Sequence, residues 1–432
     1  MLTVSAMDAR DPQEGVGAEV GAPSVVASAP AASWRPYRVA YCVPQWTWAT
    51  HGAMLRCLLA GAVGDGPDVG RASERLAAVL GVPGVVPCAS GTLAIELGLR
   101  GAGIGEGAEV VVPAFCCPFV IPPILAVGAT PVLADVGAEL NLTPETVRWV
   151  LTSRTRAVLV PHLFGNPAEI EAILDLCRPR AIAVLDDAAQ ALGATVGGRP
   201  VGTFGDAGVV SFGNGKVCFG TGGGFLVSQD RALLDRARRV VLDPGGPAAG
   251  MLRAAAVLVF RRWRRWSHPV HRAVMRIRGG RRDEVGSGYR RERMRNLDAA
   301  IARTLLDGLP ENLRARRERA LLYGDLLAGH PRVAPVPHRP GSACTKQVVA
   351  IEPGGAGDDP ARRVLDALRR EGYEASPSYR PLHLDPAYRA FARGPLPTAD
   401  GTWRRLVELP CEPSVPLREV RRICAIVRGA SG

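Results

Sequence analysis

Aromatic residues are scarce in this chain. Phe, Trp and Tyr make up 5% of its 432 residues, whereas hydrophobic residues make up 47%. The apolar content is therefore mostly aliphatic, which favours a core of Ala, Val and Leu packed in α/β layers. The length exceeds the roughly 100–200 residues of one domain, so we expect a large domain and a smaller one.

The chain also lacks a long apolar run and an export signal. The longest apolar run near the middle, AAAVLVF at 254–260, is much shorter than the ~20 residues of a membrane-spanning helix. No basic stretch followed by an apolar one opens the chain, and its first residues are small and rich in Pro. We expect a disordered extension over 1–40, no membrane span, and a cytoplasmic location.

Cysteine pairs with the spacing of a metal or redox motif are absent. The chain has ten cysteines, none of them in a C-x-x-C pair, and the only adjacent pair is Cys116-Cys117. Without an export signal, reduced thiols are expected, and each is interpreted first as a small buried hydrophobe. The sequence predicts no metal site.

Acidic residues are scarce in one segment only. The net charge is +12, and between Arg261 and Arg295 thirteen Arg stand against three acidic residues. A nucleic-acid interface would depend on this segment alone and is not favoured. Within it, residues 251–282 combine Arg pairs with Trp263 and Trp266, a composition typical of membrane-surface segments. One hypothesis is that this basic insertion contacts a membrane. The alternatives are a surface segment exposed to solvent and an arm that packs on a partner subunit.

From about residue 71 to 230, short apolar runs alternate with helical patterns. The strand candidates are continuous apolar runs, as expected when helices cover both faces of a sheet. We predict a three-layer αβα sandwich with a mainly parallel central sheet, and ligands at the carboxyl ends of its strands. The predicted helices lie at 92–102, 122–129, 144–152 and 167–178, and the predicted strands are VVP near 85, AEVVVP, TPVLADV, RAVLVP and AIAVLDDA.

A Gly/Pro-rich break at 243–250 precedes the basic insertion, and a long helical pattern follows it. We place the domain boundary inside this pattern. The predicted large domain covers 41–310, and a small α+β C-terminal domain covers 311–432.

Three local patterns suggest a cofactor site. Ser90-Gly91-Thr92 follows an apolar run and opens a helix, where backbone N–H groups bind anions such as phosphate, although the same triplet is also an ordinary helix cap. Asp186-Asp187 ends a predicted strand, where a carboxylate can meet a cofactor ring or can cap the next helix.

Lys216 lies in a glycine-rich loop between two strand-like runs, twenty-nine residues after Asp187 and five after Ser211. Alone it is an ordinary loop lysine. Pyridoxal phosphate (PLP), however, needs an amine to bind it, a carboxylate for its ring nitrogen, donors for its phosphate and a group that covers the face of its ring. These patterns offer candidates for the first three.

In combination the sequence resembles the DegT-type (DegT/DnrJ/StrS) family of PLP-dependent sugar aminotransferases, from about Pro44 to the C-terminus. The family has the fold of type I PLP enzymes. Its members mostly aminate keto-sugars attached to nucleotides, and some aminate cyclitol ketones. The matching motifs are ASGTLAIELGL, GAEVVVPAF, GATPVLADV, PHLFGNPAEI, LDDAAQALGA, the SF…K…GG loop, YRPLHLDPAY and LPTADGTWRRLVELP.

The resemblance implies a role for each candidate residue. Lys216 would form the Schiff base and then move the proton, and Asp187 rather than Asp186 would pair with the pyridine nitrogen. It also implies a homodimer, an amino-acid donor such as Glu or Gln, and a keto-sugar-like acceptor. The remaining implied residues are Gln190 near the ring, Gly91, Thr92 and Ser211 at the phosphate, and Tyr379 and His383 at the substrate.

Lys216 also bears on the alternatives. Related sugar dehydratases carry His at that position, so the lysine disfavours dehydration. A PLP enzyme of another outcome, such as elimination, is one rival, and a non-catalytic scaffold docked on a membrane is the other.

Several positions depart from the family pattern. Where the family commonly has Thr and a ring-stacking aromatic, this chain has Cys116 and Cys117, with Phe119 two positions on. Ser378 replaces the first His of the His-Tyr-x-Pro-Leu-His motif, and the loop GTGGG lacks a common Glu. Arg291 replaces an Asn expected near a partner's phosphate, which a guanidinium could bind through two hydrogen bonds.

Overall fold

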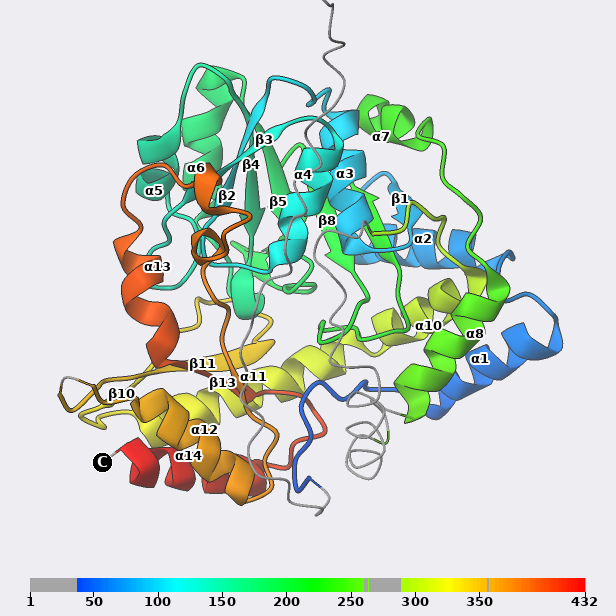
Figure 1. The fold of residues 1–432 in the computed structure, drawn as a ribbon. Coiled ribbons are helices and arrows are strands. Elements are labelled where there is room, and N and C mark those ends of the chain that lie inside the picture. The colour runs from blue at the N-terminus through cyan, green and yellow to red at the C-terminus, as the bar shows by residue number, and fades with distance from the viewer. Residues whose placement is uncertain (1–36, 260–262, 264–288, 356, 432) are drawn as a thin grey trace, which may run out of the picture.

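The computed structural model describes residues 37–259, 263, 289–355 and 357–431 (Figure 1). Most of the extension expected over 1–40 therefore lies outside the described residues. The same is true of the basic insertion, of which 251–259 and Trp263 are described.

The larger of the two main sheets has seven strands in the order β1-β9-β8-β5-β4-β2-β3. β9 runs antiparallel to both of its neighbours, and all other pairs are parallel. The strands are almost entirely buried, as their apolar sequences predict. They are β1 (Val85–Cys88), β2 (Glu109–Pro113), β3 (Thr130–Ala134), β4 (Thr155–Pro161), β5 (Ala183–Asp187), β8 (Ala207–Ser211) and β9 (Gly224–Val227).

Helices cover both faces of this sheet. Because side chains alternate along a strand, Val110 and Val112 of β2 pack on one helical layer and Val111 packs on the other. The first layer holds α3 (Gly91–Gly101), α4 (Ile121–Ala126) and α7 (Arg231–Arg238). The second holds α5 (Pro144–Val150), α6 (Ile170–Cys177), α2 (Asp68–Leu80), α1 (Trp48–Leu59) and α10 (Asn296–Asp307). The predicted three-layer α/β fold is confirmed.

The second sheet is small and antiparallel, with the order β10-β11-β13-β12. Its strands are β10 (Val333–Pro335), β11 (Lys346–Ile351), β12 (Ser376–Pro377) and β13 (Leu406–Pro410). A core of its own joins it to α11 (Leu309–Leu327), α12 (Pro360–Arg370) and α14 (Leu417–Ser431). The other described elements are β6 (Thr195–Val196), β7 (Arg199–Pro200), α8 (Pro247–Val257), α13 (Pro397–Thr402), and the 3-10 turns η1 (Pro118–Val120), η2 (Leu163–Gly165), η3 (Arg178–Arg180), η5 (Leu382–Leu384), η6 (Arg389–Phe391) and η7 (Trp403–Arg405).

The long helical pattern after the insertion forms two helices rather than one. α10 ends at Asp307, and α11 begins at Leu309. Pro310 is the cause, because it has no N–H to donate to the preceding turn and its ring clashes with the carbonyl four residues earlier.

Contacts tie the two sheets together at two places. Val39 forms a bridge with Tyr373, so the start of the described chain lies on the small sheet's side. The segment 382–402 returns to the large sheet, where Leu382 N–H donates to the Ala114 carbonyl at 2.7 Å and Ala392 forms a bridge with Leu133. The boundary at residue 310 thus stays a prediction.

Within the described ranges, no helix combines the length and the apolarity that crossing a bilayer requires.

Candidate active site

A cavity of about 810 Å³ opens at the carboxyl ends of the central strands. One candidate residue from the sequence, His383, does not line it; its Nε2 lies 2.8 Å from Asp400 Oδ1 instead. The cavity brings together the other seven, which are Gly91, Thr92, Asp187, Gln190, Ser211, Lys216 and Tyr379.

The start of α3 forms one end of the cavity. Ser90 Oγ accepts a hydrogen bond from Leu93 N–H at 3.1 Å, so this serine is the helix cap. A Cβ on Gly91 would lie only 2.8 Å from Ser211 Cβ, so the helix start meets the end of β8 without an intervening side chain. Gly91, Thr92 and Ser211 therefore face the cavity at a helix N-terminus, where partial positive charge favours a phosphate.

The two adjacent aspartates have different surroundings. Asp186 uses both oxygens: Oδ1 lies 2.6 Å from His162 Nε2, and Oδ2 accepts from Phe204 N–H at 2.8 Å. Asp187 lines the cavity, and its Oδ1 accepts from Ala189 N–H at 2.9 Å. Burial raises the pKa of Asp187, although the charge of Lys216 opposes this shift.

His162 is a cavity residue that we did not predict as a candidate. Its Nδ1 accepts from Ala168 N–H at 2.9 Å, which leaves Nε2 as the donor to Asp186. A signal existed, because His162 follows directly after β4, whose last residue Pro161 pairs with Asp187. The rule that ligands bind at carboxyl ends of strands could have identified it.

The loop between β8 and β9 carries Lys216 into the cavity. Gly215, at φ 73°, adopts a left-handed conformation that a side chain would strain. Both vicinal cysteines line the cavity; Cys116 is buried and Cys117 is half-buried. Burial raises the pKa of the Cys117 thiol despite the nearby Lys216. Phe119 lies at the cavity wall and is 48% exposed.

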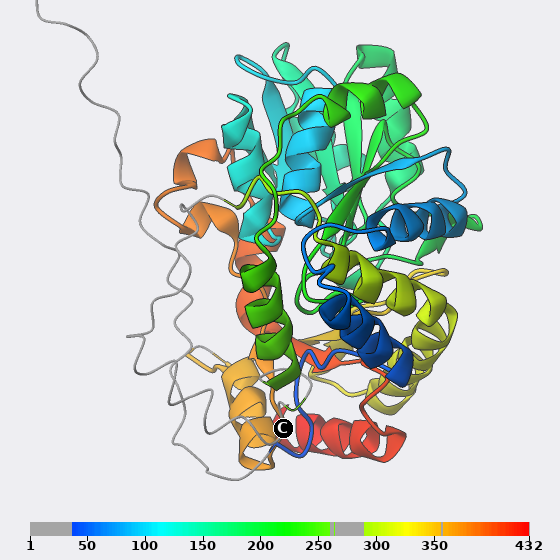
Figure 2. The same ribbon diagram turned by 90° about the vertical axis from the view of Figure 1, so that its right-hand side faces the viewer.

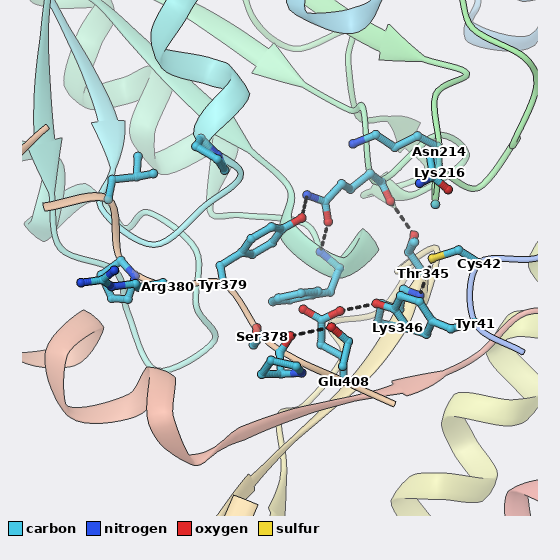
Figure 3. Close-up of a pocket in the computed structure, with 18 of the residues that line it drawn as sticks. Tyr41, Cys42, Asn214, Lys216, Thr345, Lys346, Ser378, Tyr379, Arg380 and Glu408 are labelled. Atoms are coloured by element: carbon cyan, nitrogen blue, oxygen red, sulfur yellow. Dashed lines mark hydrogen bonds between the residues drawn. The ribbon is translucent and has the colours of Figure 1, made fainter. Parts of the chain in front are cut away.

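A second chamber of about 340 Å³ adjoins the first, and Lys216, Gln190 and Tyr379 line both (Figure 3). Gln190 Nε2 donates to the Tyr379 hydroxyl at 3.2 Å, and Phe164 N–H donates to Gln190 Oε1 at 3.1 Å. The rings of Phe164 and Tyr379 stack with centroids 5.9 Å apart. Gln190 and Tyr379 line both chambers and form the boundary between them, and Phe164 packs against Tyr379 from the second chamber.

A buried charged group lines the far side of the second chamber (Figure 3). Lys346 Nζ lies 3.1 Å from Glu412 Oε1 and 3.2 Å from the centroid of the Tyr41 ring. The Tyr41 hydroxyl donates to Glu408, and burial raises the pKa of that carboxyl. Sequence reasoning missed this group because its members come from three distant segments.

Arg291, expected near a partner's phosphate, has another contact within this chain. Its Nε donates to Glu96 Oε2 at 3.1 Å, its Nη2 donates to the other carboxylate oxygen, and the Tyr289 hydroxyl also donates to Glu96. Glu96 belongs to α3 and is fully buried. The guanidinium thus neutralises a buried carboxylate of its own chain.

The profile of the DegT/DnrJ/EryC1/StrS aminotransferase family matches residues 49–428. The chain is 32% identical to the dTDP-4-dehydro-2,3,6-trideoxy-D-glucose 4-aminotransferase of Saccharopolyspora spinosa, over 84% of this chain and 88% of that protein. It is 28% identical to the GDP-perosamine synthase of Vibrio cholerae, over 84% and 90%.

Two solved structures share the fold at similar identity. The aminotransferase TlmJ of Streptoalloteichus hindustanus has a TM-score of 0.72 and 29% identity, with 91% of this chain and 98% of that one covered. DesV of S. venezuelae, solved with a ketimine intermediate, has a TM-score of 0.71 and 28% identity, with 88% and 94% covered.

Proposed function

The chain belongs to the DegT/DnrJ/EryC1/StrS aminotransferase family, and from this premise we propose how its residues bind PLP and transfer an amino group. The enzyme is a PLP-dependent aminotransferase. The observation that carries the proposal is a single cavity lined by Lys216, Asp187 and the N-terminus of α3. These are the amine, the carboxylate and the phosphate donors that the cofactor requires.

The proposed reaction moves an amino group from glutamate or glutamine to the keto group of a sugar nucleotide or a related polyol. The relatives support this substrate class, since the S. spinosa protein is named as a 4-aminotransferase of a dTDP-linked keto sugar. The second chamber also supports it, because hydroxyl and carboxylate groups line it beside Lys216. Such groups suit a polyhydroxylated acceptor.

When bound, PLP supplies an electron sink for the carbon that loses a proton. Lys216 Nζ would hold the cofactor covalently and, once free, would move a proton at the reacting carbon. Asp187 would keep the ring nitrogen protonated, and its buried position would make that interaction strong because little water would screen it. Gln190 and Tyr379 orient the ring and the substrate from the boundary between the chambers.

Asp186 and His162 act as a positioning pair. One oxygen of Asp186 accepts a hydrogen bond from His162 and the other accepts from a backbone N–H. These bonds fix the end of β5 and hence the direction of the Asp187 side chain. At the opposite end, Gly91 and Thr92 offer backbone N–H groups and Ser211 offers a hydroxyl to the phosphate.

Covalent trapping tests the proposal. Purified protein is mixed with PLP, reduced with borohydride and digested, and the peptides are analysed by mass spectrometry. We expect a pyridoxyl adduct on Lys216 and none in the Lys216→Ala variant, with Lys346→Met retaining the adduct as a control. An adduct on another lysine, with none on Lys216, would overturn the proposed site.

The proposed homodimer has support from exposed apolar side chains. Trp48 and Leu59 of α1 and Leu252 of α8 are 91%, 81% and 72% exposed, and the two helices lie side by side (Figures 1 and 2). Exposed apolar side chains of this size on adjoining helices suit a contact surface. Light scattering should give a dimer mass for wild type and a monomer mass for Leu59→Glu, while Trp149→Glu, an exposed residue of α5, stays dimeric.

A reducing, cytoplasmic location is also proposed. All ten cysteines lie in the described residues and are free. Free thiols of this number suit a compartment that keeps them reduced.

A further inference from the structure

α8 contains the first described residues of the basic insertion, and the proposed reaction leaves it unused. Figure 2 shows this helix (green) running along the side of the molecule from the level of the large sheet toward the small one. Gly250 and Ala254 are buried against the core, so one face of α8 is fixed. Arg253 follows Gly250 by three residues and precedes Val257 by four, which places all three on that side of the helix.

Arg253 lines the cofactor cavity. It also lines a neighbouring cavity of about 290 Å³, together with Ser90, Ser211 and the glycine loop 220–223. A Cβ on Gly222 would lie 2.8 Å from Arg253 Nη1, so the guanidinium rests directly against that loop. Its side chain therefore reaches the end of the cavity where α3 begins.

The neighbouring arginines already have carboxylate partners. Arg291 is bound by Glu96, and Arg290 lies 3.1 Å from Glu292. Arg295 bridges Glu292 at 2.6 Å and Asp298 at 3.4 Å. In the part of the chain that the structure describes, Arg253 has no hydrogen bond or ion pair.

The charge nearest to Arg253 does not satisfy it either. Asp298 accepts from Thr221 Oγ1 and from Arg295. Burial raises the pKa of Asp298, and the charges of Arg295 and Arg253 only partly offset that shift. Asp298 thus makes no hydrogen bond to Arg253, and the donors of that guanidinium stay available for a second anion.

We propose that Arg253 binds the phosphate of PLP in the same chain, so that the basic insertion supplies a cofactor ligand. This inference rests on the proposed function, because it requires PLP in this cavity. A guanidinium donates two parallel hydrogen bonds to phosphate oxygens, and its charge adds to that of the α3 N-terminus. Without Arg253, the dianionic phosphate would meet backbone and hydroxyl donors, because Arg290, which also lines the cavity, already lies 3.1 Å from Glu292.

The test compares PLP with pyridoxal, which has the same ring and aldehyde and lacks the phosphate. Dissociation constants are measured by absorbance titration for wild type, Arg253→Ala, Arg253→Lys and the control Arg239→Ala, an exposed arginine after α7 that lines neither cavity. We expect Arg253→Ala to weaken PLP binding by roughly tenfold or more, since a lost bond to a charged group has that effect. Arg253→Lys should lose less, and pyridoxal should bind all four proteins alike.

Three results would overturn the inference. Unchanged PLP affinity in Arg253→Ala would show that the guanidinium does not bind the cofactor. An equal loss for PLP and pyridoxal would indicate an effect on the ring or on folding. Retained PLP affinity with lost binding of uridine diphosphate would assign Arg253 to the diphosphate of an acceptor. If wild type itself fails to bind PLP on Lys216, the proposed function fails instead.

Discussion

At the scale of single residues, Asp186 and Asp187 show how neighbours in sequence take different tasks. Alternation along β5 sends their side chains in different directions. The strand pattern alone could not choose between them, because both lie at the end of the same apolar strand; the family resemblance chose Asp187. The choice depends on which carboxylate already has hydrogen bonds to both oxygens. Asp186 does, because it accepts from His162 and from the Phe204 N–H, and the pattern of the strand itself does not predict these partners.

Asn substitutions separate the two roles. We expect Asp187→Asn to retain covalently bound PLP and to lower the rate of amino transfer by about 10²-fold or more, because an amide cannot hold a proton on the ring nitrogen. Asp186→Asn should instead lower the free energy of unfolding by roughly 1–3 kcal/mol, since it weakens a buried charge-assisted hydrogen bond. Single-turnover kinetics and urea unfolding measure the two effects. Equal rates for both variants would contradict this assignment.

Cys117 stands at the position where the family commonly has an aromatic residue. Because burial raises the pKa of its thiol, we expect slow alkylation by iodoacetamide near neutral pH and faster alkylation as the pH rises. Since Cys117 lines the cavity, bound PLP should slow the reaction further. Peptide mass spectrometry reports the modified fraction. Alkylation at the same rate with and without PLP would place Cys117 away from the cofactor.

At the scale of elements, the turn His162–Gly165 after β4 sets the boundary between the chambers. Phe164 has a φ of 57°, a left-handed conformation that costs a non-glycine residue about 1–3 kcal/mol. Its backbone N–H bonds Gln190 and its ring stacks on Tyr379, so the turn places both groups at once. No periodic pattern predicts such a turn, which explains why sequence reasoning missed it.

Gly165 makes this turn possible, since its φ is 83° and a Cβ would lie 2.8 Å from Thr345 N. We expect Gly165→Ala to lower the free energy of unfolding by roughly 1–3 kcal/mol. Gly52→Ala is the matched control, because Gly52 lies within α1 with no atom near its would-be Cβ, and alanine should stabilise that helix slightly. Thermal unfolding measures both. A Gly165→Ala protein as stable as wild type would contradict the strain argument.

Glu109 at the start of β2 anchors the segment 382–402 to the large sheet. Burial alone would raise its pKa, but hydrogen bonds from Arg393, Thr152 and Arg154 outweigh burial and lower the pKa to about 2. The folded pKa lies below the unfolded value of 4.5, so the stabilisation is complete above about 4.5 and is lost as the pH falls toward 2.

Glu109→Gln should therefore lower the free energy of unfolding at pH 7 by roughly 1–3 kcal/mol. The gap between variant and wild type should narrow as the pH drops below about 4.5. Urea unfolding across this range measures the gap. A gap that stays constant down to the lowest pH would mean that the carboxylate charge has no part in the anchor.

At the scale of the whole molecule, the sequence predicted the features that depend on local patterns of apolar and polar residues. The alternation of apolar runs and helical stretches identified the layers of the large domain, and it predicted a ligand site at the carboxyl ends of the strands, where the cavity of about 810 Å³ opens. It did not predict that residues 382–402 return to the large sheet, or that Tyr41 reaches Glu408. Those contacts join segments hundreds of residues apart, and their residues have no periodic or motif signal.

The basic insertion shows the same limit. Its composition suggested contact with a membrane or with a partner subunit, and that suggestion stays a prediction; one residue of its described start, Arg253, lines the cavity at the carboxyl ends of the strands. Composition alone cannot tell which arginine of a cluster faces inward, because that depends on the register of α8 against the core.

The most direct test of amino transfer is an absorbance spectrum of the purified protein with PLP, recorded for wild type and Lys216→Ala before and after glutamate is added. The proposed chemistry predicts a visible band that requires Lys216 and bleaches with glutamate, as the cofactor takes up the amino group and 2-oxoglutarate is released in equal amount. A wild-type spectrum that shows no Lys216-dependent band, or a band that neither glutamate nor glutamine bleaches, would contradict it.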